Sequence, residues 1–192
     1  MKTYKTYIRA ILPLFVVLGL VGSAQAQSAT TVDVDMAATA SIVSSIELTK
    51  NADVAFGQIA ATTAAPVSLS PTGTGSTGVG ANASAGKFTV GGTAGSTFTV
   101  TFASEVDMEA AGSNPSLKWA PVVTGLGTDN PSSSTSITSA STILTLADNS
   151  GSGVYYLYVG GSLYEAGSPG TILDGVAPDN YSGTLNVEVS YN

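Results

Sequence analysis

Alternation of apolar and polar residues, at two places in the sequence, limits most strongly how this chain can fold. Residues 183–192 read GTLNVEVSYN, and in an extended strand four apolar side chains share one face: Leu185, Val187, Val189 and Tyr191. Residues 31–43 read TVDVDMAATASIV and place a longer apolar row on one face: Val32, Val34, Met36, Ala38, Ala40 and Ile42. Helical spacing would scatter these side chains around the axis. The alternation therefore predicts a closing strand over 183–191 and an N-terminal strand over 32–42.

Further short apolar segments lie between these ends, and turn-forming residues separate most of them. The predicted strands cover residues 45–48, 54–59, 66–70, 87–90, 97–103, 117–123, 143–146 and 154–159. About nine or ten short strands in one domain indicate an all-β sandwich or a barrel-like closure. Two stretches rich in Gly, Ser and Thr, 71–86 and 128–141, are predicted to be long surface loops.

The first residues have the order of parts of a secretory signal peptide. Three basic residues precede the apolar run Ile11–Val21, and Ala24-Gln25-Ala26 supplies a small-x-small cleavage pattern. The apolar run is shorter than the ~20 residues that span a bilayer as a helix, and no later stretch approaches that length. We therefore expect cleavage before Gln27, no membrane span, and export to the periplasm, the cell surface or the medium.

This cleavage divides the sequence into three predicted parts. Residues 1–26 form the signal peptide, residues 27–44 the N-terminal alternating strand, and residues 45–192 the β-sandwich domain. After cleavage Lys50, Lys87 and Lys118 are the only basic residues, against 13 acidic ones. A surface of that charge repels phosphate backbones, which argues against nucleic-acid binding.

Two residue types that the sequence lacks narrow the function further. Without cysteine, the fold depends on burial and hydrogen bonding alone. Without histidine, the chain has neither the commonest general base nor the commonest metal ligand, which excludes Ser-His-Asp and Cys-His catalysis and the usual zinc sites. We predict that the protein is not an enzyme and uses no cofactor.

Three parts of the sequence resemble an uncharacterised bacterial secreted family, a domain of unknown function abundant in Gram-negative envelopes. Residues 45–59, SIELTKNADVAFGQI, match its opening, including an apolar-x-Phe-Gly-x-Ile motif at Val54, Phe56, Gly57 and Ile59. Residues 86–100 resemble its central strand pair, and residues 181–192 its closing Tyr-Ser-Gly-Thr and alternating strand. Residues 129–164 are not covered by the resemblance.

More loosely, the sequence is similar to chaperone–usher pilins and to spore-coat-like surface proteins. Those subunits are immunoglobulin-like, antiparallel sandwiches of Greek-key type, and many end in an alternating strand with a penultimate aromatic residue, as Tyr191 is here. In such pilins, the N-terminal extension of one subunit completes the sheet of the next. The cysteine pair that many of them carry is missing.

The resemblance implies a structural or adhesive cell-surface subunit, pilin-like or fimbrial, whose partners are copies of itself or related subunits. Residues 32–42 would complete either the sheet of their own domain or that of a neighbour, and the composition does not separate these cases. The alternative function is a monomeric secreted binding module for a glycan or for calcium.

Two groups of residues resemble ligand-binding motifs. Gly73, Gly75 and Gly78 spell G-x-G-x-x-G, but a dinucleotide site needs a strand before it and a helix after it, so we interpret this segment as a flexible turn. Glu105, Asp107 and Glu109 share one face of a strand. They indicate a solvated edge, a calcium site, or, least specifically, the paired acids of a glycosidase.

The remaining candidates are turns and aromatic residues. Residues 148–151 and 174–180 offer oxygen ligands, but Asp, Asn and Gly there also suit turns directly. Aromatic side chains gather in one region, at Tyr155, Tyr156, Tyr158 and Tyr164. Because both faces of residues 154–159 are apolar, we predict a central strand covered on both sides, with a carbohydrate-stacking surface as the alternative. Trp119 is predicted to lie in the core.

Overall fold

Antiparallel strands make up the regular structure of the residues that the computed structural model describes, which are 40, 42–60, 66–110, 117–139, 142–167 and 179–192. Within these ranges the one helical segment is a 3-10 turn, Pro131–Ser133. The strands are β1 (Glu47–Ala52), β2 (Val67–Leu69), β3 (Gly86–Gly92), β4 (Thr97–Phe102), β5 (Val106–Ala110), β6 (Leu117–Leu126), β7 (Thr135–Ile137), β8 (Thr142–Thr145), β9 (Ala147–Asn149), β10 (Ser152–Glu165), β11 (Tyr181–Ser182) and β12 (Val187–Tyr191).

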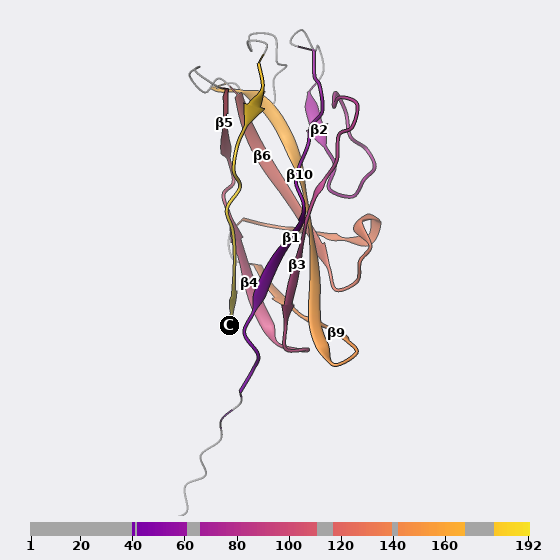
Figure 1. Ribbon diagram of the computed structural model, residues 1–192, viewed down its shortest axis with the longest axis vertical. Helices are drawn as coiled ribbons and strands as arrows, with labels where there is room; N and C mark the ends of the chain where they lie inside the picture. Colours follow the sequence, from indigo (N-terminus) through magenta and orange to yellow (C-terminus); the bar gives the residue numbers. More distant parts are fainter. Residues whose placement is uncertain (1–39, 41, 61–65, 111–116, 140–141, 168–178) are drawn as a thin grey trace, which may run out of the picture. The chain divides into compact units, whose positions relative to one another are not determined.

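Two sheets pack face to face within residues 41–192 (Figure 1). The larger sheet has the order β1-β3-β10-β6-β5-β11, with β2 and β9 paired to β10 and β7 paired to β6. The smaller sheet has the order β12-β4-β8. This arrangement confirms the predicted all-β, antiparallel, immunoglobulin-like sandwich.

The core forms where the inward faces of both sheets meet. Its fully buried side chains include Val90, Phe98, Val100 and Leu157, and the rings of Phe98 and Tyr155 meet edge to face, with centroids 5.5 Å apart. These residues occupy alternate positions of β3, β4 and β10, so the period of two in the sequence is what fills the space between the sheets.

Strand β10 is the centre of the larger sheet, between β3 and β6. Tyr155, Leu157 and Val159 are buried on its inward face, and Tyr158 is buried on its outward face. This confirms the predicted central strand with two covered faces. Trp119 on β6 is also buried, as predicted, and its indole N–H donates a 3.0 Å hydrogen bond to the carbonyl of Gly160.

Two predictions about individual segments were wrong. Residues 54–59 form no strand, only an isolated bridge between Ala55 and Ser84. Gly57 there has φ +73°, and a Cβ on it would lie 2.5 Å from the carbonyl oxygen of Ala81. The chain therefore crosses residues 80–81 at close range here, instead of pairing with a neighbouring strand. Residues 128–141 are not a single loop, because β7 within them pairs with β6 and buries Ile137.

Some predicted elements lie outside the described residues. They include the signal peptide, residues 1–26, and Val32, Val34, Met36 and Ala38 of the N-terminal strand. Ala40 and Ile42 are described, and both are exposed and outside any strand. Among the described residues, no helix has the length and hydropathy to cross a membrane.

Candidate assembly groove

The first and last long strands of the chain each have one edge with no strand beside it. Within the described residues, β1 pairs with β3 alone and β12 pairs with β4 alone. Unpaired strand edges expose N–H and C=O groups that can accept another strand.

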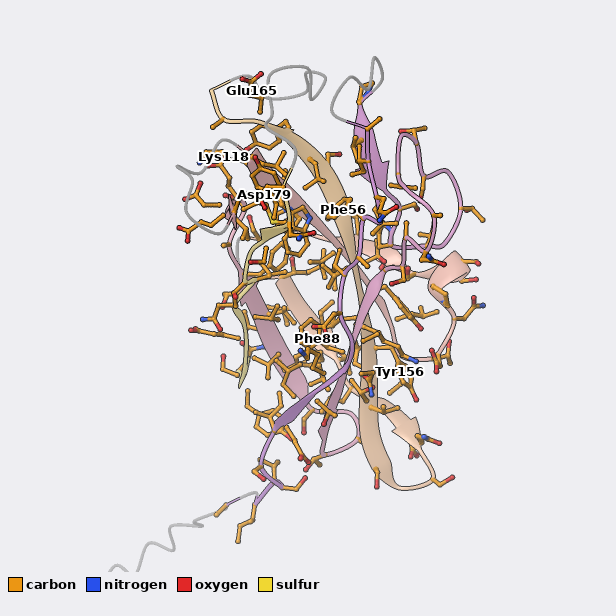
Figure 2. All side chains as sticks on the ribbon, turned by 45° about the horizontal axis from the view of Figure 1, so that its top comes forward. Phe56, Phe88, Lys118, Tyr156, Glu165 and Asp179 are labelled. Carbon is orange, nitrogen blue, oxygen red and sulfur yellow. The ribbon has the colours of Figure 1, made fainter. Side chains whose placement is uncertain are left out.

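A groove with a volume of about 430 Å³ opens between residues 50–56 and residues 181–185. Its lining is largely apolar and aromatic and includes Phe56, Phe88, Met108, Trp119 and Val159. Four of these five are buried core residues, and Phe88 is partly buried against them. Phe56 and Phe88 are labelled in Figure 2. The groove is therefore a place where the hydrophobic core reaches the surface.

The C-terminal side of the groove leads into the closing strand, which was predicted over 183–191 and is confirmed only over Val187–Tyr191, since residues 183–186 lie outside any strand. Leu185 lines the groove directly, and Val187, Val189 and Tyr191 follow it in alternation; all four are partly buried. The residues between them are exposed. The hydroxyl of Tyr191 accepts a 2.9 Å hydrogen bond from the backbone N–H of Thr93, which fixes the end of β12 to the turn after β3.

The other side of the groove carries two charged side chains, Lys50 and Asp53, that sequence reasoning did not place there. Lys50 lines the groove opposite Phe88 in the β1–β3 register, and its ammonium group forms a 2.7 Å salt bridge with Asp53. The side chains of Lys50 and Asp53 are 58% and 79% exposed. The signal was present in the sequence, because Ile46, Leu48 and Lys50 alternate and so put a charge in the apolar phase of a strand.

The acidic residues of β5 share an outward face, as predicted. Asp107 and Glu109 are exposed and alternate with buried Val106 and Met108. Lys118 on the neighbouring strand bonds both Asp107, at 2.9 Å, and Glu105. Hydrogen bonds from Lys118 and then Tyr164 lower the pKa of Glu105. Glu105 and Asp107, two of the three carboxylates that were considered as calcium ligands, therefore bond Lys118 instead. Among the described residues, no group of three acidic residues is placed to hold a metal ion.

The tyrosine cluster is mostly covered. Tyr155, Tyr158 and Tyr164 are buried, and only Tyr156 of the four is partly exposed. The Lys87 ammonium lies 5.0 Å from the centre of the Tyr156 ring and is bonded by both carboxylate oxygens of Asp129. The Tyr158 hydroxyl donates to Asp129 at 2.8 Å, and burial followed by this bond raises the pKa of Tyr158.

The glycine and aspartate motifs adopt turn geometry where they are described. Gly73, Gly75 and Gly78 all have positive φ, and no helix follows them before β3 begins. Asp148 closes the β9–β10 hairpin by accepting a 2.7 Å hydrogen bond from the backbone N–H of Gly151. The run 174–180 lies outside the described residues except for Asp179 and Asn180.

Comparison with known proteins gives a family but no activity. No curated protein matches the chain. A family model described as a domain of unknown function, DUF4402, matches residues 46–191, which include both strands at the groove. The resemblance to an uncharacterised family is thereby confirmed, whereas the likeness to pilins stays a prediction. The chain belongs to the DUF4402 family of domains of unknown function.

Proposed function

We propose that this protein is a structural or adhesive subunit of the cell surface, pilin-like, whose sandwich is completed by a strand from a neighbouring copy. The observation that supports this function best is the apolar groove between residues 50–56 and 181–185, which lies beside the end of edge strand β1 and beside the segment that leads into edge strand β12. An added strand would pair with an open edge and cover core side chains at the same time.

The alternating segment 32–42 has the pattern that such a groove requires. With Val32, Val34 and Met36 facing inward, each buried side chain would contribute about 1.5–3 kcal/mol, and Asp33 and Asp35 would stay in water. Export through the predicted signal peptide, residues 1–26, would bring the subunit to the compartment where surface polymers assemble.

Three described acidic side chains outside the groove support a non-catalytic role. Asp107 and Glu105 bond Lys118, and Asp129 bonds Lys87 and Tyr158. These bonds occupy the carboxylate oxygens, and they lower the pKa of Glu105 and of Asp129, which suits a structural network better than a general acid.

A monomeric binding module for a glycan remains the second candidate, on one observation. Tyr156 is partly exposed on the outward face of the larger sheet, in register with Thr89, whose hydroxyl bonds the exposed Asn51 at 2.7 Å. An aromatic ring beside amide and hydroxyl groups is a combination that can hold a sugar ring. No comparable observation favours calcium.

Assembly is tested on the purified exported protein by sedimentation and negative-stain microscopy. We expect concentration-dependent oligomers or filaments in the wild type, and monomers for Val34→Asp, because a buried unpaired carboxylate costs several kcal/mol. The control Thr39→Asp changes a residue on the polar face of the same segment and should still assemble. A wild-type protein that stays monomeric at all concentrations, and binds a sugar in a Tyr156-dependent manner, would overturn the proposal in favour of the second candidate.

A further inference from the structure

The chain that leads into β1 leaves the domain at one end of that strand. The backbone N–H of Ser44 donates a 2.9 Å hydrogen bond to the hydroxyl of Thr93, the residue that follows β3, and the two hydroxyls lie 3.0 Å apart. Ser44 therefore continues the antiparallel β1–β3 ladder past its end. Ile42 and Val43, which precede Ser44, are 97% and 44% exposed, so the described chain lies outside the core here.

The groove lies toward the other end of β1. Its described lining includes Lys50 and Ala52 of β1 and continues to Phe56, but it includes no earlier residue of that strand. At about 3.3 Å per residue, the chain from Ser44 to Ala52 covers about 26 Å. In Figure 1, β1 rises from the lower end of the sandwich, where β3 and β4 are joined. The exit of the N-terminal segment and the groove that could receive such a segment are therefore separated along this strand.

Strand β12 runs between the same two ends in the opposite direction. Leu185, just before it, lines the groove, and the hydroxyl of Tyr191 at its end bonds the backbone N–H of Thr93. The C-terminal strand thus ends beside the exit at Ser44. We call this end of the domain the Thr93 end, and the end where Phe56 lines the groove the groove end.

Segment 31–43 would have to reverse its direction before Ser44 to fill the groove of its own domain. Residues 40–46 contain no Gly, Asn, Asp or Pro, the residues that tight reversals favour. The described residues among them belong to no turn, and the two Ser44–Thr93 contacts hold the backbone in line with β1. The domain therefore directs its N-terminal segment away from its own groove.

We propose that the groove is filled in one direction only, by residues 31–43 of a second copy that enter at the groove end, with residue 43 outermost. This inference rests on the proposed function. The added strand runs parallel to β1 and antiparallel to β12, and antiparallel is the orientation of both strand pairs in the smaller sheet. The Thr93 end of one copy then meets the groove end of the next.

Joining of this kind is heterologous, so it continues from copy to copy and does not close on itself in pairs. In a closed pair, two Thr93 ends would face each other, and each segment would pass about 26 Å of its partner before it reached the groove. Residues 36–43 would be used on that distance, which leaves only Val32 and Val34 of the apolar row for the groove. Head-to-tail joining places the groove directly beyond the exit, so the whole apolar row can reach it.

The test uses full-length exported protein whose own segment is disabled by Val34→Asp. A second, unaltered copy of residues 31–43 is joined after Asn192 through a flexible linker of about four Gly and Ser residues. Because Asn192 lies at the Thr93 end, this joined segment can fill the groove of its own chain only in the proposed direction. We expect a monomer by sedimentation, with a melting temperature about 5 °C or more above that of Val34→Asp alone. The matched control carries Val34→Asp in the joined segment as well, and should gain nothing.

Wild-type protein and a free peptide of residues 31–43 complete the test. We expect the wild type to form a continuous series of oligomers of increasing size. If it stops at dimers, or if the free peptide stabilises Val34→Asp while the joined segment does not, the direction is wrong and the groove proposal stands. If neither the peptide nor the joined segment stabilises that variant and the wild type stays monomeric, the proposed function itself fails.

Discussion

The centre of the larger sheet and its β1 margin bury similar residues in different ways. At the centre, β10 has neighbours on both edges and cover on both faces, and Leu157 and Val159 are 0% and 1% exposed. At the margin, Phe88 is only partly buried and lines an open groove beside Lys50. The same strand pattern therefore gives a fully covered core at the centre and a partly exposed one at the margin, which is the difference that the proposed strand addition would remove.

The ion pairs show the same difference. Lys87 and Lys118 bridge neighbouring strands or loops within the domain and are about three-quarters buried. The Lys50–Asp53 pair is local and largely exposed, so it contributes little to the domain by itself. The described lysines thus divide into two that connect separate parts of the sandwich and one, Lys50, whose ion pair joins residues three positions apart.

The largest expected effect separates the two regions by stability. Leu157→Ala should lower the free energy of unfolding by about 2–5 kcal/mol, because the buried centre cannot collapse around the cavity. Phe88→Ala should cost the isolated domain less, about 1–2 kcal/mol, since part of its ring already faces solvent. Denaturant unfolding of monomeric protein measures both, and equal losses would mean that the groove is as complete as the core.

Assembly should show the opposite order. Phe88→Ala removes groove surface that an incoming strand would cover, and it should weaken association at least tenfold. A mild core variant, Val159→Ala, lines the deeper side of the same groove and should unfold more easily while weakening association less. Sedimentation of both variants at a temperature where both are folded checks this, and association that simply follows stability would contradict it.

A smaller effect concerns how the C-terminal strand is fixed. Tyr191→Phe removes the hydroxyl that accepts from the Thr93 N–H and should cost about 1 kcal/mol in unfolding free energy. Gly92→Ala should cost at least as much, because a Cβ there would collide with the same hydroxyl. A Cβ at Gly92 would also lie 2.8 Å from Leu146 Cδ1, so part of the cost should remain without the hydroxyl. Thermal unfolding measures each, and if Gly92→Ala costs less in the Tyr191→Phe background than in the wild type, the two residues interact as described.

The fold could be predicted from the sequence because alternation is a local signal. Residues 187–191 and 97–102 show a period of two, residues 154–159 form a short run that is apolar on both faces, and each is a strand in the structure. The apolar residues of segment 54–59 predict a strand, and this prediction is wrong. Phe56 is instead buried beside Trp119, because the backbone at residues 55–56 bonds residues 80–84, which cross it. Such a contact between distant segments leaves no local pattern.

The groove could be predicted only in part for the same reason. The sequence shows that Leu185 belongs to an alternating apolar row and that Lys50 takes an apolar position in another row. It does not show that both residues line one groove. Phe88 and Met108 lie in segments far apart in sequence, and they meet at the groove only because β3 and β5 belong to one sheet. Sheet order, which the alternation of single strands cannot specify, decides which side of the sandwich stays open.

The smallest expected effect is a pH dependence of the folding stability, which arises at Glu105 and Asp129, outside the groove. Bonds from Lys118 and Tyr164 lower the pKa of Glu105 below its ordinary value of 4.5, so the folded state binds a proton there less readily than the unfolded chain does. The resulting stability is present above pH 4.5 and is lost as the pH falls through the lower, folded-state pKa. Asp129, bonded first by Lys87 and then by Tyr158, has a lowered pKa and adds in the same direction.

Melting temperatures measured between pH 3 and pH 6 should therefore fall toward acid, and less steeply for Lys118→Met than for the wild type. Glu105→Gln, which cannot ionise, should flatten the same part of the profile, and combining the two variants should add little, since both remove one interaction. If Lys118→Met kept the full acid slope, the bonds of Asp129 to Lys87 and Tyr158, rather than the Lys118 pairs, would carry the pH dependence. The Lys118 pairs would then contribute nothing measurable to the stability of the sandwich.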